Sequence, residues 1–392
     1  MGRISFRRPE NRARNRGTTV SIDELPELLR PAIEKYRDTT EDQGRLAPEL
    51  VAELRDRGAF RLFTPVELGG HEAPVAAALD FYAKVARMDG PTAWLLWNFN
   101  VGFAAGWLPA EAAARIWGEG ADPLIANSGQ PGLLTPVDGG YRLTGRWKIV
   151  SGAHVAEWFL LAGADPSAGP GFAGLRFCVV PRADVSVLDT WDVVGMRASD
   201  SNTVVADDVF VPDTRTAGLF APNRIDRPAY RLPAINLLFP GCGAVLIGMA
   251  QAAIDEVIRI APAKSGFDGV PLAEKDHVTV AVGRALSQVA AARLLLLETQ
   301  RELDRTVAAG AETTDEQRAA VRGALCHVTE TARTVLVAMY ELGSSEPLYR
   351  ASRLGRIFRD GIAAAQSANL STTQWTIPGR IAVGQPSGWP FV

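Results

Sequence analysis

The chain has 392 residues, of which 47% are hydrophobic and 22% are charged, and its formal net charge is -3. A chain of this length is predicted to form two or three packed subdomains, which excludes one small domain. The slightly negative charge and the scattered basic residues exclude a general attraction to nucleic acid or to anionic lipid.

The N-terminal segment is strongly basic. Six arginines lie between Arg3 and Arg16, and only Glu10 has the opposite charge. No apolar segment follows that would make a secretory signal, so residues 1–20 are predicted to be a disordered basic tail.

The three cysteines, Cys178, Cys242 and Cys326, lie far apart and lack the CxxC spacing of a zinc site. We interpret them as reduced core thiols, which favours a cytoplasmic protein, and we expect no bound metal. No run of eighteen apolar residues free of charges occurs in the sequence, so a membrane span is not expected.

Residues 21–122 have the pattern of a helical domain. Leu25, Leu28, Leu29 and Ile33 recur at intervals of three to four residues, which is the period of an amphipathic helix. The segments 76–88 and 94–107 continue this pattern on either side of a turn at Asp89-Gly90-Pro91.

Residues 123–224 have the texture of a β domain. Short segments at 141–143, 147–150, 158–162 and 176–180 are separated by glycine, proline and aspartate, and a β-branched stretch ends near Pro212. Long alanine- and leucine-rich helices then return in residues 225–392. The order helical, β, helical predicts an α+β fold.

Several motifs are specific enough to indicate a family. The 143–158 segment, Leu-Thr-Gly-Arg-Trp-Lys-Ile-Val-Ser-Gly and onward, resembles the middle-domain signature of the acyl-CoA dehydrogenase superfamily, in which a G-x-W-x-x-S-G turn meets a flavin ring. The likeness covers roughly residues 20–392 and includes these further segments: 126–132, 195–201, 208–212, Arg359-Asp360 and Gly379-Arg380.

Within this superfamily, residues 89–94 and 124–127 look like those of the group D flavin monooxygenases. The resemblance implies an N-terminal helical domain, a middle β-barrel-like domain and a C-terminal four-helix bundle that usually builds a homotetramer. It also implies reduced FAD or FMN, with FAD slightly favoured, O2 as co-substrate, a separate flavin reductase, and an aromatic or amine substrate.

The resemblance points to a set of flavin-binding residues. If the Trp147 segment is an extended strand, residues 147, 149 and 151 share one face, so the Trp147 indole and the Ser151 hydroxyl could address one ligand. A tryptophan packed in the core is the alternative. The other candidates are Asn127, Ser128 and Gln130 on the preceding strand, and Lys264 near the flavin phosphate, with a solvated surface lysine as an equal alternative. Arg359 shares a helix face with Arg353 and Arg356, where the flavin of a neighbouring subunit could lie, and a solvated or Asp360-paired face is the equal alternative.

The catalytic position departs from both families. Asp360 is the only acid from Pro347 to Val392, and it belongs to the Arg-Asp pair, so a dehydrogenase base is not evident. Where group D hydroxylases often carry a histidine, this chain has Gln366-Ser367. Ser367 is therefore the local catalytic candidate, although an unassisted serine is a weak base.

His154 lies beside the predicted flavin turn and is a second catalytic candidate, with a structural role as the alternative. Five residues are expected on the substrate side: Trp97, Asn98, Asn100, Met196 and Arg197. The buried asparagines among them would need hydrogen-bond partners.

Three functions remain open at this point. The first is a reduced-flavin monooxygenase, the second a flavin dehydrogenase or oxidase with an unusual base, and the third a non-catalytic relative. The missing histidine favours an amine or an electron-rich carbon as the oxygen acceptor, since neither needs a strong base.

Overall fold

The computed structural model describes residues 21–118, 122–169, 172–219 and 221–389. The predicted tail at residues 1–20 lies outside this range. The chain forms two compact units that alternate along the sequence. Unit 1 comprises Met1–Ala73, Leu95–Asp192 and Arg197–Ala234, and unit 2 comprises Pro74–Trp94, Val193–Met196 and Ile235–Val392.

Unit 1 contains the predicted N-terminal helices and the sheet. Its helices are α1 (Leu25–Gln43), α2 (Pro48–Asp56), the second half of α4 (Gly90–Phe99), α5 (Ala110–Trp117) and the short α6 (Pro228–Arg231). The apolar side chains predicted for the first helix are buried at Leu25, Leu29 and Ile33, while Leu28 is exposed.

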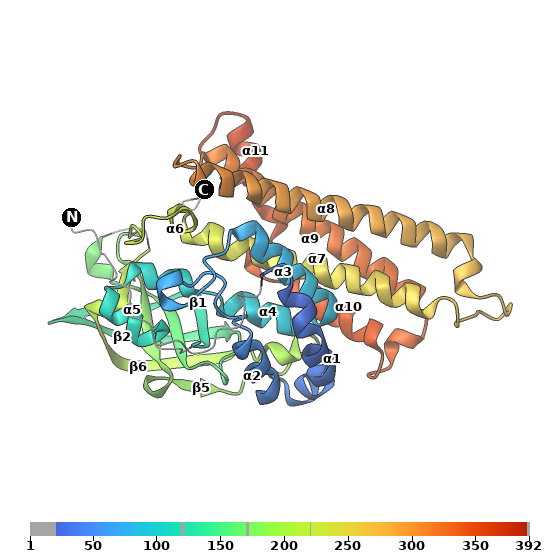
Figure 1. The fold of residues 1–392 in the computed structure, drawn as a ribbon, viewed down its shortest axis with the longest axis horizontal. Coiled ribbons are helices and arrows are strands. Elements are labelled where there is room, and N and C mark those ends of the chain that lie inside the picture. The colour runs from blue at the N-terminus through green and yellow to red at the C-terminus, as the bar shows by residue number, and fades with distance from the viewer. Residues whose placement is uncertain (1–20, 119–121, 170–171, 220, 390–392) are drawn as a thin grey trace. The chain divides into compact units, whose positions relative to one another are not determined.

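The sheet of unit 1 has seven strands in the order β5-β6-β2-β1-β3-β4-β7 (Figure 1). All neighbours are antiparallel except β1 and β3. The strands are β1 (Ile125–Val137), β2 (Gly140–Val150), β3 (Trp158–Ala164), β4 (Leu175–Pro181), β5 (Ser186–Leu188), β6 (Asn202–Pro212) and β7 (Thr216–Gly218). The segments predicted as strands from sequence are therefore confirmed.

Unit 2 is helical. It contains α3 (Val75–Met88), most of α7 (Ala234–Ile260), α8 (Asp276–Ala308), α9 (Asp315–Leu342), α10 (Arg353–Ala364) and α11 (Thr376–Ala382). The long helices α7, α8 and α9 run side by side, as Figure 1 shows. Small residues allow α7 to approach its neighbours closely. A Cβ on Gly243 of α7 would lie 2.5 Å from Leu325 of α9, and one on Gly248 of α7 would lie 2.3 Å from the carbonyl oxygen of Ala83 in α3.

All three cysteines are free and buried. Burial raises the pKa of the Cys178 and Cys242 thiols to about 12 and that of Cys326 to about 11. Thiols with such high pKa values are poor nucleophiles, so the prediction of reduced core thiols is confirmed.

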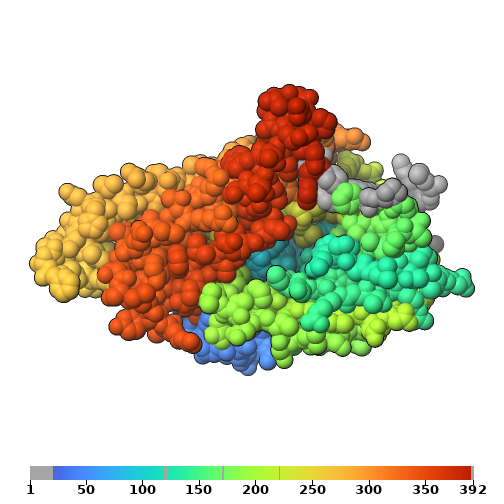
Figure 2. All heavy atoms as spheres, turned by 180° about the vertical axis from the view of Figure 1, so that it is seen from behind, coloured from blue at the N-terminus to red at the C-terminus, as the bar shows by residue number. Residues whose placement is uncertain are grey.

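Two helices are long and apolar enough to cross a membrane by length and composition alone. The first is α7, with a mean hydropathy of 1.8 over its most apolar stretch, which is 83% buried within the protein, as expected of a core helix. The second is α8, with a mean hydropathy of 1.5 and only 28% of the stretch buried. Figure 2 shows α8 and α9 in orange along the outer surface of unit 2.

Candidate active site

Strands β1 and β2 separate part-way along their length. Among the described residues they pair from Leu133 to Val137 of β1, opposite Thr144 to Gly140 of β2. Beyond that point the first residues of β1, from Ile125 to Ser128, pair with β3, whereas the last residues of β2 pair with β6. The sheet therefore forks at Gly132 and Gly145, and each arm carries one edge without a strand partner.

The indole of Trp147 fills the base of this fork. The side chain is fully buried, and Nε1 donates a hydrogen bond to the Ala162 carbonyl oxygen of β3 at 3.1 Å. A Cβ added to Gly132 would lie 2.6 Å from Cζ2 of the ring, and one added to Gly145 would lie 2.7 Å from Cη2. The indole therefore occupies the space between the two strands that the missing side chains of both glycines leave open.

The predicted shared face of residues 147, 149 and 151 is wrong. Ile149 has a φ of 58°, and the register of β2 against β6 shifts between Trp147 and Val150. As a result Trp147 and Ser151 are buried, whereas the Ile149 side chain is 66% exposed. Because the Trp147 indole is buried and its N–H is engaged by Ala162, the structure gives this residue a supporting role in place of the predicted bond to a flavin.

Ser151 lies in a turn that is held on two sides. Its hydroxyl is 2.9 Å from the Ser201 hydroxyl, which is 2.7 Å from that of Ser199. The next residue, Gly152, has a φ of 74°, and a Cβ there would lie 2.2 Å from the Phe99 ring of α4. The turn is therefore packed between residues 199–201 and the end of α4.

His154 follows this turn and lies between two carboxylates. Nδ1 is 2.6 Å from Oδ1 of the buried Asp200, and Nε2 is 3.1 Å from Oδ1 of the exposed Asp189. The buried Asp200 therefore fixes the orientation of the imidazole ring from one side, and the exposed Asp189 lies within hydrogen-bonding distance on the other. This geometry supports a structural role for His154, and its catalytic role stays a prediction.

The predicted flavin-facing residues of β1 lie along the free arm of the fork. The Asn127 amide donates to the Asn98 carbonyl oxygen at 2.8 Å and so ties this arm to α4. Ser128 is half-buried and Gln130 is exposed, and a Cβ on Gly129 would meet no atom within 4 Å. This part of the strand faces open space.

The substrate-side candidates Trp97 and Asn98 on α4 and Asn100 just after it are buried, and they differ in their contacts. Asn100 accepts a hydrogen bond from the Leu62 amide at 2.7 Å and donates to the carbonyl oxygens of Ala59 and Leu96. Its predicted need for partners is confirmed, but its amide is fully used by the backbone, so the predicted role on the substrate side is corrected to a structural one. Trp97 and Asn98 are 6% and 8% exposed.

The remaining candidates Met196, Lys264, Arg359 and Ser367 are in unit 2. Arg197 is exposed and is the first residue after Met196 that belongs to unit 1. The Met196 amide donates to Asp360 Oδ1 at 2.6 Å. The Lys264 ammonium donates to the Gly343 carbonyl oxygen. Arg359 and Ser367 are half-buried, on α10 and just after it.

Comparison with known proteins places this geometry in a family. Residues 241–371 match the family "Acyl-CoA dehydrogenase, C-terminal domain". The chain is 30% identical over 393 residues to the pigment production hydroxylase of Rhodococcus sp. (strain ATCC 21145), covering 96% of this chain and 99% of that protein. The chain belongs to the flavin-dependent monooxygenases of the acyl-CoA dehydrogenase superfamily.

Two further relatives agree with this assignment. The oxygenase component of an FADH(2)-dependent resorcinol hydroxylase from Rhizobium sp. (strain MTP-10005) is 34% identical, over 45% of this chain and 44% of that protein. The crystal structure of a 3-HSA hydroxylase from Rhodococcus sp. RHA1 is 27% identical, with a TM-score of 0.87, and covers 93% of this chain and 97% of that one. The predicted fold and the predicted oxidoreductase class are confirmed.

The residues of this flavoenzyme's fork fit a flavin. An isoalloxazine needs hydrogen bonds along its polar edge and an apolar wall for its rings. The unpaired arms of β1 and β2 offer backbone amides and carbonyls, the open space at Gly129 allows close approach, and Ile149 presents an exposed apolar side chain.

Four residues of this site lie within the segments that carry the family resemblance, but sequence reasoning gave none of them the role that the structure shows: Gly132, Gly145, Ile149 and Asp200. The left-handed backbone at Ile149 and the contacts of Asp200 leave no mark in a residue pattern. The two glycines could have been found, since glycine inside a strand often marks a bulge or a close approach.

Proposed function

We propose that this enzyme is the oxygenase component of a two-component system. It takes reduced flavin from a separate reductase and transfers one oxygen atom of O2 to a small aromatic or amine substrate. The second oxygen atom leaves as water and the flavin leaves oxidised, so electrons and atoms balance. FAD is proposed ahead of FMN, in line with the FADH(2)-dependent relative.

The observation that carries the proposal is the fork held open by Trp147 beside the buried Ser151 turn. Bound there, a reduced flavin supplies the activation of O2. The protein's own residues bind and orient the flavin: Asn127, Ser128 and Gln130 along one arm, and Ser151 at the end of the other. We propose that Lys264 lies near the flavin phosphate and that Arg359 lies against the flavin of a neighbouring subunit. Trp97, Asn98, Met196 and Arg197 are proposed for the substrate side.

The contacts of Asp360 weigh against a dehydrogenase. Proton removal next to a carbonyl requires a free carboxylate within reach of the substrate. Asp360 is 5% exposed and its carboxylate accepts the Met196 amide, so it is occupied in positioning a loop.

The enzyme is expected to incorporate one atom of 18O2 into product. Chemically reduced FAD would be mixed with the enzyme, 18O2 and a panel of phenols, indoles and arylamines, and the masses of the products would be measured by mass spectrometry. A labelled product that requires enzyme supports the proposal. Tight binding of oxidised flavin with substrate-driven flavin reduction would instead indicate a dehydrogenase.

The same assay on Ser367→Ala tests the catalytic position. The Ser367 hydroxyl makes no hydrogen bond to any described residue, so we propose that it offers one neutral hydrogen bond and that no strong base acts here. Product formed per flavin oxidised should fall by about ten-fold or less. A fall of about a hundred-fold or more would contradict this and indicate an activated serine.

We also propose that the enzyme is a homotetramer. Helix α8 exposes four large apolar side chains, Val280, Leu286, Leu294 and Leu295, which is more apolar surface than a helix facing water needs. Arg284 and Ser287 are exposed on the same helix, and a charged arginine disfavours burial in lipid. We therefore propose that other copies of the chain cover the exposed apolar side chains of α8. Light scattering should give about four times the mass of the 42.0 kDa chain, and a monomer at micromolar concentration would refute the assignment.

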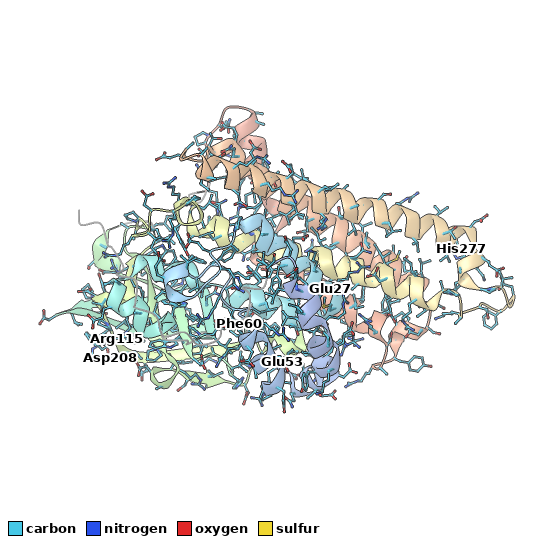
Figure 3. The ribbon with its side chains drawn as sticks, viewed as in Figure 1. Glu27, Glu53, Phe60, Arg115, Asp208 and His277 are labelled. Carbon is cyan, nitrogen blue, oxygen red and sulfur yellow. The ribbon has the colours of Figure 1, made fainter. Side chains whose placement is uncertain are left out.

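No group of three or more His, Cys, Asp or Glu side chains that could hold a metal occurs among the described residues. His277, for example, lies exposed near the start of α8, as Figure 3 shows. The proposal therefore assigns no role to a metal.

A further inference from the structure

Residues Val193–Met196 form an excursion of the chain. They belong to unit 2, whereas the residues before and after them, up to Asp192 and from Arg197, belong to unit 1. The flank before the excursion is tied to the segment after it by one residue of that segment, Asn202. Its Oδ1 accepts hydrogen bonds from the amides of Thr190 at 2.7 Å and Trp191 at 2.9 Å.

Asp200 joins these flanks to the Ser151 turn. It is 2% exposed and has a φ of 49°, a left-handed conformation that aspartate tolerates better than most residues. Its carboxylate accepts three hydrogen bonds: from the His154 backbone amide at 2.7 Å, from His154 Nδ1 at 2.6 Å, and from the Asn202 side-chain amide at 2.8 Å. The Asp200 carbonyl oxygen accepts a fourth, from the Ala153 amide at 3.1 Å.

The last two residues of the excursion, Gly195 and Met196, are fixed on α10. The Met196 amide donates to Asp360 at 2.6 Å, and Gly195 lies so close to α10 that a Cβ there would be 2.1 Å from the Arg359 carbonyl oxygen. Only three residues separate Met196 from Asp200. Four steps of extended chain span at most about 14 Å, so a shift of the docked loop is passed on to Asp200.

We propose that Asp200 and Asp360 are positioning residues that couple the Ser151 turn to α10 through the loop Val193–Met196. Asp360 holds Met196, the last residue of the loop, and Asp200, four residues further along the chain, holds the Ser151 turn. Loosening either aspartate changes the geometry of the turn. The functional consequence, a change in how the flavin is oriented, depends on the proposed function, whereas the coupling itself does not.

The test is hydrogen exchange at the amides of Gly152, Ala153 and His154 in the enzyme without flavin. These amides donate to the Ser199 carbonyl, to the Asp200 carbonyl and to the Asp200 carboxylate. Their protection from exchange therefore reports directly how firmly residues 199–200 hold the turn. We expect Asp200→Asn and Asp360→Ala each to raise their exchange rates by about ten-fold, the equivalent of one hydrogen bond. In the double variant the two effects should be less than additive.

The control is Asp189→Asn. Asp189 also contacts His154, but its side chain is 91% exposed, and an exposed ion pair contributes little. Its substitution should leave the three exchange rates within about two-fold of wild type. If Asp200→Asn does not fold, Asp360→Ala alone decides the question, because Asp360 is distant in sequence from the turn that its substitution is expected to loosen.

Normal exchange at the turn in Asp360→Ala would overturn the coupling to α10, and normal exchange in Asp200→Asn would overturn the role of Asp200 in holding the turn. Product formed per flavin oxidised is measured on the same variants and should fall with rising exchange, a relation that a merely stabilising residue would not produce. If wild-type enzyme forms no labelled product, the proposed function fails while the exchange result still judges the coupling.

Discussion

Gly132→Ala is expected to weaken flavin binding by about ten-fold or more and to lower the free energy of unfolding by about 1–3 kcal/mol. The new methyl carbon would lie 2.6 Å from the Trp147 ring and 2.9 Å from the Thr144 carbonyl oxygen. The indole is buried on every side and its N–H is bonded to Ala162, so it has no free space into which to retreat. The strain must therefore move the arms of the fork, which changes the distance between them.

A matched control is available in the same strand. At Gly129 an added Cβ meets nothing within 4 Å, so Gly129→Ala should leave stability within about 0.5 kcal/mol of wild type. Chemical denaturation and flavin titration on both variants would check the prediction. Equal flavin affinity in Gly132→Ala and wild type would show that the spacing of the fork does not control binding.

Much of the fold could be predicted from sequence because burial leaves a periodic record. The leucines of α1 recur with the helical period, and the β-branched residues of β6 mark a strand. The interleaving of the two units could not be predicted, because it depends on where the chain crosses between them. The break lies inside α4, whose residues show no change of pattern between Trp94 and Leu95.

The candidate site was predictable where residues are close in sequence and unpredictable where they meet only in space. Ser151 and His154 belong to one local motif, and the structure brings them into one turn. Asp200 is 46 residues from His154, and its role follows only from the folded contact between them. Ile149 shows a second limit, since the left-handed backbone that exposes its side chain occurs at a β-branched residue that normally avoids it.

Gly195→Ala is expected to detach the loop Val193–Met196 from α10. The added carbon would lie 2.1 Å from the Arg359 carbonyl oxygen, 2.5 Å from its carbonyl carbon and 3.0 Å from the Asp360 nitrogen. These are backbone atoms of a helix, which yield less readily than a side chain, so the loop must move instead. Its movement breaks the hydrogen bond from Met196 to the buried Asp360 carboxylate.

Loss of that bond should cost about 1–3 kcal/mol, the penalty for leaving a buried polar group without a partner. The entropy of unfolding is about 2.1 cal/mol/K per residue, so in a chain of 392 residues the melting temperature should fall by about 1 °C for each kcal/mol. Val194→Ala is the control, because Val194 is in the same loop but is 81% exposed, and it should change stability by less than about 0.5 kcal/mol. Scanning calorimetry would compare the two variants, and equal melting temperatures would show that Gly195 tolerates a side chain and that the loop is not docked as tightly as its contacts with α10 indicate.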